Sequence, residues 1–289
     1  MDYVTPPEIV AESIKLAKRK ANLSILDLLV RGVLAGAFLG YATSLALVIV
    51  AQGLPGIAAA ALFPVGFVIL VLLGLELATG NFALLPPALV AREVSLARLL
   101  RNWGWVYFGN LLGSVLYGLL FYLAITNFGT SNGGALGDQL RQIAQKKTLA
   151  YAALGGSGWA TAFVKGMLCN WMVTLGAVLA LASRSTVGKI VAMWLPIMTF
   201  FALGYEHSIV NMYLIPTGMM LKAPVSFKSW WLWNQVPVTL GNIVSGALFT
   251  GLALYLTYAA KPAAVHLPAK ELEMPAPVQM MAPSRAEVQ

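Results

Sequence analysis

The stretch GYEHSIVN, from Gly204 to Asn211, decides the fold, because it interrupts a long apolar run with charged and polar residues. A related stretch, GLELATGN, from Gly74 to Asn81, interrupts an earlier apolar run in the same way. Unwound backbone at membrane depth must line a cavity or be buried in protein, because lipid cannot satisfy its hydrogen-bonding groups. The two stretches predict two broken membrane helices whose breaks meet near the middle of the bilayer.

The composition indicates that lipid is the solvent for most of the chain. Of its 289 residues, 59% are hydrophobic and 10% are charged, whereas a soluble domain carries about 25% charged residues. The net charge of +8 comes from Lys and Arg that fall mainly at the ends of apolar runs. This distribution controls membrane topology, and it predicts no nucleic-acid partner.

Six apolar runs approach the roughly 20 residues that a membrane span needs. They cover residues 32–51, 57–90, 102–128, 162–183, 190–221 and 233–260, and the second and fifth contain the two breaks. Residues 130–147 are polar and Gly-rich, so we expect a loop there. The predicted fold class is an all-α integral membrane protein with six transmembrane helices.

The flanks of the transport domain, residues 27–260, have their own patterns. Residues 1–26 predict an amphipathic helix on the cytoplasmic membrane surface, begun by a capping box of Thr5 and Glu8. Residues 261–289 are rich in Pro and Ala, and predict a disordered cytoplasmic tail. Lys and Arg predominate on the side of the N-terminus, which predicts a multi-pass protein of a plasma or inner membrane with both termini cytoplasmic.

An internal repeat relates the two halves, residues 27–128 and 160–260. Three matches occur in the same order: Arg31-Gly32 with Lys165-Gly166, Glu76 with Glu206, and Asn102 with Asn234. Each half holds three spans, so the second half must insert upside down relative to the first. The prediction is an inverted 3+3 repeat, in which interrupted helices at corresponding positions mark the permeation site.

His207 is the central candidate, because it is the only histidine before the predicted tail and lies in the second break. Ionisable groups inside a membrane are usually functional. Beside a path for a small anion, the ring could offer an N–H hydrogen bond or hand over a proton. Thr79, in the first break, can bond it across the pore. The alternative is a core histidine satisfied by a neighbouring hydroxyl or carbonyl.

The two glutamates at matching repeat positions, Glu76 and Glu206, predict structural roles. A carboxylate lining the path would repel an anion, so we expect both to accept bonds from the freed backbone N–H groups of the broken helices. Glu206 also remains among the candidate pore residues. The other residues expected to shape the breaks are Gly74, Gly204, Asn81 and Asn211.

Further candidates surround the breaks. Asn170 either lines the path or ties helices together, and Lys165 either draws anions into a vestibule or extends its ammonium toward water. A pore also needs hydrophobic constrictions to exclude hydrated ions. The apolar residues placed to form them are Phe63, Phe67, Leu77 and Phe200.

Other functional classes fit less well. Cys169 is the only cysteine, so we expect no metal site and no cofactor. One histidine and two symmetric glutamates provide no nucleophile–base set, which argues against an enzyme. A neutral-solute channel of the aquaporin type is the remaining rival, and the paired Asn-Pro-Ala motifs of that family are absent from this sequence.

Several motifs resemble the formate/nitrite transporter family. They are ELATGN from Glu76, KGMLCNW from Lys165, GYEHSIVNM from Gly204 and PVTLGNI from Pro237. The resemblance implies an aquaporin-like fold assembled as a homopentamer, with one pore per subunit and lipid in the central hole. It also implies a central histidine at His207 paired with Thr79, the family's asparagine at Asn170, and constrictions at Phe63, Phe67, Leu77 and Phe200.

The family's cargo is a small weak-acid anion that moves in a pH-dependent way, with protons as a partner. The GGSGW segment that ends at Trp159 resembles the nitrite-transporting branch, which favours nitrite, with formate as the alternative. Two positions depart from the family pattern. Ala78 replaces a larger residue before the loop threonine, and Leu154 stands where a vestibule lysine is expected, with Lys147 farther away.

Overall fold

A computed structural model describes residues 2–259, and every regular element in that range is a helix. The elements before residue 130 are α1 (Pro6–Ala21), α2 (Ile25–Ala51), α3 (Gly56–Leu62), α4 (Pro64–Leu72), α5 (Ala78–Val90) and α6 (Leu96–Ile125). Those that follow are α7 (Gly134–Ala153), α8 (Gly156–Leu179), α9 (Thr186–Ala202), α10 (Ser208–Met220), α11 (Phe227–Trp230), η1 (Trp231–Gln235), α12 (Val236–Val244), η2 (Ser245–Leu252) and α13 (Ala253–Tyr258). The predicted tail, residues 261–289, lies outside the described residues.

Four continuous helices are long and apolar enough to cross a membrane: Ile25–Ala51, Leu96–Ile125, Gly156–Leu179 and Phe227–Tyr258. They coincide with the first, third, fourth and sixth predicted spans, although each begins several residues earlier. Three of them start at a serine, because the hydroxyls of Ser24, Ser95 and Ser226 accept a backbone N–H bond from the first turn. Such caps let a helix begin in polar sequence before the apolar run.

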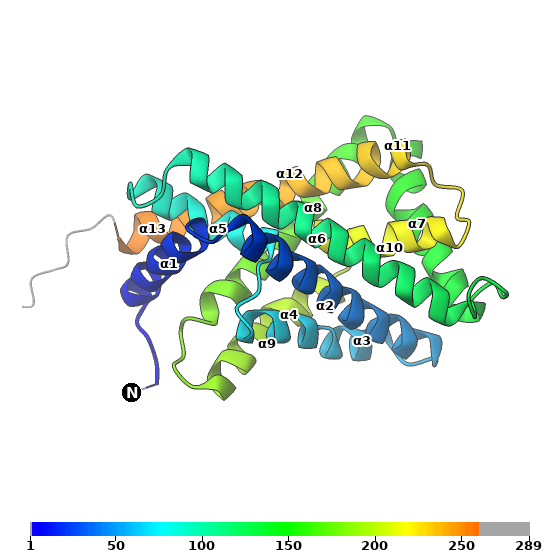
Figure 1. The fold of residues 1–289 in the computed structure, drawn as a ribbon, viewed down its shortest axis with the longest axis horizontal. Coiled ribbons are helices and arrows are strands. Elements are labelled where there is room, and N and C mark those ends of the chain that lie inside the picture. Colours follow the sequence, from blue (N-terminus) through cyan, green and yellow to red (C-terminus); the bar gives the residue numbers. More distant parts are fainter. Residues whose placement is uncertain (1, 260–289) are drawn as a thin grey trace, which may run out of the picture.

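The predicted loop over residues 130–147 is wrong, because most of it belongs to α7. The buried positions of this helix, Leu140, Ala144, Thr148 and Tyr151, recur every three or four residues and form one face. The polar residues between them gave the sequence its loop-like appearance. In Figure 1, α7 and α1 lie at opposite ends of the molecule.

The amphipathic helix α1 begins as predicted at its capping box. The Glu8 carboxylate accepts bonds from the backbone N–H and the hydroxyl of Thr5, at 2.9 and 2.8 Å. The buried face of α1 includes Ala17 and Ala21, which pack with Leu85 of α5 and neighbouring apolar side chains. One face of α1 therefore packs on the rest of the protein, and its other face is exposed.

Pairs of long helices pack with their backbones close together. α2 lies along α6, and α8 lies along α12 (Figure 1). A Cβ atom at Gly113 of α6 would collide with the carbonyl of Val33, and one at Gly241 of α12 would collide with the carbonyl of Phe163. Small residues at such crossings provide the van der Waals contact that holds membrane helices together.

The last span differs from the other long helices, because η1 and η2 are π-helical segments. Segments of this kind are rare and often mark functional sites. Within η2, Gly246 abuts Phe82 and Gly251 abuts the carbonyl of Ala83, both on α5. The wide turns therefore lie directly against the helix that follows the first break.

Candidate functional site

Both broken helices break at a glycine. Gly74 has φ +64° and Gly204 has φ +66°, a region in which a Cβ atom is strained. In each case the N–H of the next residue bonds back to the preceding helix, from Leu75 to Leu70 and from Tyr205 to Phe200. These bonds end α4 and α9 with a Schellman motif, and three residues outside regular structure lead into α5 and α10.

Two asparagines satisfy the unwound backbone. Asn110 donates to the carbonyls of Gly32 and Glu76, at 2.8 and 2.9 Å, and accepts from the N–H of Ala78 at 2.9 Å. Asn242 makes the same three bonds in the second half, to the carbonyls of Gly166 and Glu206 and from the N–H of Ser208, at 2.8, 3.2 and 3.0 Å. Neither asparagine was among the predicted site residues.

A buried lysine–glutamate pair stands beside the first break. The Lys20 ammonium lies 2.7 Å from the Glu76 carboxylate, which is 1% exposed. Asn81 donates to the same carboxylate at 2.8 Å and to Asn102 at 2.9 Å. This polar cluster compensates a negative charge that would otherwise be costly inside the protein.

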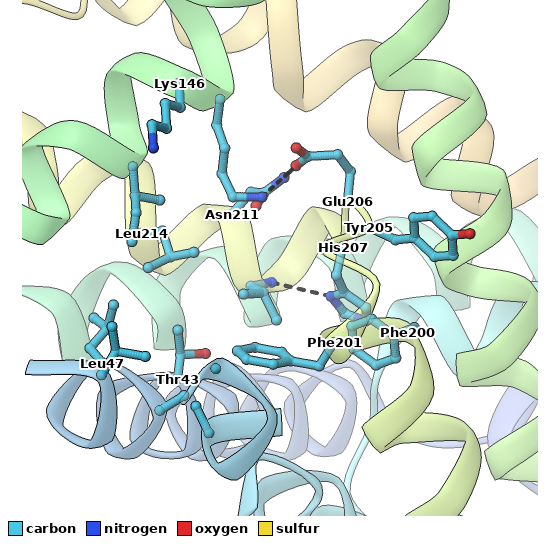
Figure 2. Close-up of a pocket in the computed structure, with 18 of the residues that line it drawn as sticks. Thr43, Leu47, Lys146, Phe200, Phe201, Tyr205, Glu206, His207, Asn211 and Leu214 are labelled. Atoms are coloured by element: carbon cyan, nitrogen blue, oxygen red, sulfur yellow. Dashed lines mark hydrogen bonds and ion pairs between the residues drawn. The ribbon is translucent and has the colours of Figure 1, made fainter. Parts of the chain in front are cut away.

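The second break carries the matching cluster. The Lys147 ammonium lies 2.7 Å from the Glu206 carboxylate, and Asn211 donates to that carboxylate and to Asn234, at 2.8 and 2.9 Å (Figure 2). The hydroxyl of Tyr151 donates to the Glu206 carboxylate as a third partner, at 2.9 Å. In the described part of the chain, the bonds to both carboxylates thus come from side chains rather than from the freed N–H groups we expected.

His207 and Thr79 lie together, each at most 3% exposed, with the histidine Nε2 3.1 Å from the threonine Oγ1. The other ring nitrogen, Nδ1, accepts the backbone N–H of Val210 at 3.2 Å, so the ring caps the start of α10. A nitrogen that accepts a bond carries no proton. The neutral ring therefore carries its proton on Nε2 and donates it toward Thr79.

Asn170 joins two helices beside this pair. Its amide donates to the carbonyls of Thr79 and Asn242, at 3.1 and 2.7 Å. Of the two roles considered, tying helices together is the one that these bonds fulfil. Its side-chain oxygen is buried without a hydrogen-bond partner within residues 2–259.

Two cavities lie next to the His207–Thr79 pair, one lined by His207 and the other by Gly80, the residue after Thr79. The Lys147 cavity holds about 560 Å³ and is lined in part by Lys147, Lys165, Phe200, Gly204, Glu206, His207 and Asn211. The Lys20 cavity holds about 360 Å³ and is lined in part by Lys20, Phe67, Gly74, Glu76, Leu77 and Asn81. Most of the predicted site residues therefore border one cavity or the other.

Aromatic rings pack together at the wall of the Lys147 cavity. Phe63 meets Phe200 edge to face at 5.7 Å and stacks on Phe201 at 4.0 Å between ring centroids. The Lys165 ammonium lies 5.9 Å from the ring centroid of Tyr151, beside the Lys147 cavity. Phe63, Thr79 and Asn170 line neither cavity, and all three are buried in the packed interior.

Sequence reasoning missed the two lysines that pair with the glutamates. Lys20 was assigned to a surface helix, and Lys147 to a loop. One signal was available: each lies in an amphipathic segment that precedes a half of the repeat. A buried carboxylate in each break also required a cation nearby.

Comparison with known proteins identifies related chains. The profile of a family described as "Formate/nitrite transporter" matches residues 7–256. A "Probable formate transporter" of Methanothermobacter thermautotrophicus is 34% identical over 89% of this chain and 97% of its own length. The "Formate channel BtFdhC" of Bacillus thuringiensis is 31% identical, also over 89% of this chain and 97% of its own length.

Two solved structures are similar along almost their whole length. An "FNT family ion channel" has a TM-score of 0.75 and 27% identity, and it covers 88% of this chain and 99% of its own. A "Pentameric formate channel with formate bound" has a TM-score of 0.65 and 28% identity, and it covers 86% of this chain and 98% of its own. The all-helical fold is therefore shared with known channels.

Proposed function

Because the chain belongs to the formate/nitrite transporter family, we propose that it passes a small weak-acid anion between the Lys147 cavity and the Lys20 cavity. The observation that carries this proposal is a buried histidine–threonine pair next to two lysine-bordered cavities, one lined by His207 and the other by Gly80, the residue after Thr79. The cationic borders favour an anion over the neutral solute of the rival hypothesis.

The proposed architecture has six spans in two inverted halves. Two of the spans are each made of half-helices, α3 and α4 with α5, and α9 with α10. The strongest support is the repetition of the same bonds around Asn110 and Asn242. The matching pairs of Lys20 with Glu76 and Lys147 with Glu206 extend the repeat to α1 and α7. With a cytoplasmic N-terminus, the Lys20 cavity would open to the cytoplasm.

In the proposed mechanism the anion receives its hydrogen bond from Thr79. His207 donates Nε2–H to the Thr79 oxygen, which leaves the threonine's own hydrogen free for the permeant. A doubly protonated ring would turn an N–H toward the N–H of Val210 and lose the cap of α10. The geometry therefore favours His207 as a hydrogen-bond donor that stays neutral, rather than as a proton donor.

The lysines serve this path without trapping the anion. Each is already paired with a buried carboxylate, so the cluster as a whole carries little net charge. An anion is drawn into the cavity, loses water at the apolar constriction, and exchanges that water for the Thr79 hydroxyl. Weak binding at each stage allows the ion to leave again.

Formate is the first proposed cargo, and nitrite is the second. The relatives at 34% and 31% identity are named for formate. The segment that suggested nitrite lies at the start of α8, and Trp159 stacks on Phe163 there. The test is uptake of labelled formate and labelled nitrite by purified protein in liposomes at fixed membrane potential. The faster uptake identifies the preferred cargo.

Substitutions at Thr79 test the mechanism. Thr79→Val keeps the shape and removes the hydroxyl, so we expect formate flux to fall tenfold or more, because a bond to a charged group contributes about 1.5–3 kcal/mol. Thr79→Ser keeps the hydroxyl and should retain most of the flux. Equal flux in the valine variant and the wild type would reject Thr79 as the donor.

The assembly belongs to the same proposal. We propose a homopentamer with one path per subunit and lipid in the central hole, and the similar structure named as a pentameric channel supports the five-subunit assembly. Protons take part outside the path in this proposal, because an anion that leaves on an acidic side is protonated there to its neutral acid.

A further inference from the structure

The Lys147 cavity has more positive charge than the path requires. Within residues 2–259 only Lys147 of its three lysines lies within ion-pair distance of a carboxylate. Lys146 and Lys165 also line the cavity. Figure 2 places the Lys146 ammonium on the side of the cavity formed by α7. Two cations therefore remain available to an anionic ligand.

The opposite wall of this cavity is apolar. Phe200, Phe201, Leu47 and Leu214 line it, and Figure 2 shows them below and beside Lys146. Phe201 stacks on Phe63 at 4.0 Å, so the aromatic wall continues into the constriction. A volume of about 560 Å³ falls in the range of small-molecule pockets and far exceeds what formate needs.

We infer that the Lys147 cavity is a binding site for an aromatic monoanion, which blocks the path by resting on the constriction. The anionic group pairs with Lys146 and Lys165, and the ring packs on Phe201 and the leucines. The stacked Phe63 and Phe201 rings stop a ligand of this width. This inference rests on the proposed function, because it assumes that the cavity is one mouth of the conducting path.

The Lys20 cavity is a poorer match for such a ligand. It holds about 360 Å³. Lys20 is paired with Glu76 and Arg31 with Asp27, so within residues 2–259 Arg19 is its one lining cation outside an ion pair. The binding of aromatic anions should therefore differ between the two faces of the membrane.

Benzenesulfonate is a suitable probe, because its permanent charge keeps it from crossing lipid on its own. Two measurements are made: titration calorimetry on the detergent-solubilised protein, and inhibition of formate uptake in liposomes with the probe on both sides. We expect saturable binding and block, and much weaker effects from methanesulfonate, which lacks the ring.

The Lys146→Gln variant should raise the dissociation constant and the half-blocking concentration about tenfold, as for one lost charge-assisted bond. Leu214→Asn tests the apolar wall independently and should weaken binding in the same direction. The control variants are Lys228→Gln, an exposed residue of α11, and Arg31→Gln, in the Lys20 cavity, and both should bind like the wild type.

Several results would overturn the inference: no saturable binding, unchanged affinity in both cavity variants, a larger loss in Arg31→Gln, or transport of benzenesulfonate itself. Failure of the proposed transport function would be distinguishable from failure of the binding site. A protein that binds the probe yet carries neither formate nor nitrite would reject conduction while leaving the binding site in place.

Discussion

At His207 the backbone fixes the chemistry of the side chain. The Val210 N–H occupies Nδ1, so the residue acts as a helix cap and presents Nε2–H to Thr79. The sequence located this histidine and its threonine partner, because a lone ionisable group in an interrupted span is a strong signal. The sequence did not show whether His207 or Thr79 donates the hydrogen bond between them. That depends on the histidine tautomer, which is set by the bond from the Val210 N–H to Nδ1 in the folded protein.

The neutral-ring mechanism makes a specific prediction. Asparagine is a good helix cap, so His207→Asn should keep α10 in place and keep the pH profile of formate uptake between about pH 5 and pH 8. Uptake rates in liposomes across this range provide the measurement. His207→Leu, which cannot cap, serves as the comparison and should lose flux at every pH. Formate uptake that no longer depends on pH in the His207→Asn variant would mean that the His207 ring does act as a proton donor.

The buried ion pair beside the second break predicts a stability effect. Lys147→Met removes the cation from Glu206, which is 3% exposed, and should cost about 3–5 kcal/mol. Thermal unfolding in detergent measures the loss. Lys146→Met, on the same helix, should have little effect, and adding Glu206→Gln to Lys147→Met should recover most of the stability. An unchanged midpoint in Lys147→Met would contradict the pairing.

At the scale of helices, the apolar runs located the four continuous membrane-length helices and both interruptions. The beginnings of the helices were missed, since a serine cap allows a helix to start in polar sequence. α7 was missed for a related reason: its apolar face is narrow, and composition alone resembles a loop. The pairing of Lys147 with Glu206 was missed for the same reason, because Lys147 lies in α7.

The contact between α2 and α6 can be tested with one pair of glycines in α6. Gly113→Ala places a methyl group against the Val33 carbonyl and should destabilise the protein by about 1–3 kcal/mol. Gly104→Ala, in the same helix, meets open space and should be neutral or slightly stabilising. Unfolding midpoints of the two variants in one detergent make the comparison. Equal midpoints would mean that the helices do not touch at Gly113.

For the whole molecule, the proposed inverted arrangement predicts which segments share a side of the membrane. In a Cys169→Ser background, cysteines introduced at Lys15 and Gln52 should react with an impermeant reagent from opposite sides, because α2 separates them. Labelling of intact cells probes the outer face of the membrane, and labelling of inverted vesicles probes the inner face. Reaction of both positions from one side would exclude a membrane-crossing α2.

The wide turns of η2 have a consequence for the register of the last span. Gly246 and Gly251 face α5 only because the π segment sets their angular positions. Deleting one residue between 245 and 252 would shorten the wide turns, and the residues that follow would take new angular positions toward α5. A larger side chain would then replace Gly251 at the Ala83 carbonyl, so tolerance of single-residue deletions should be lost over this segment.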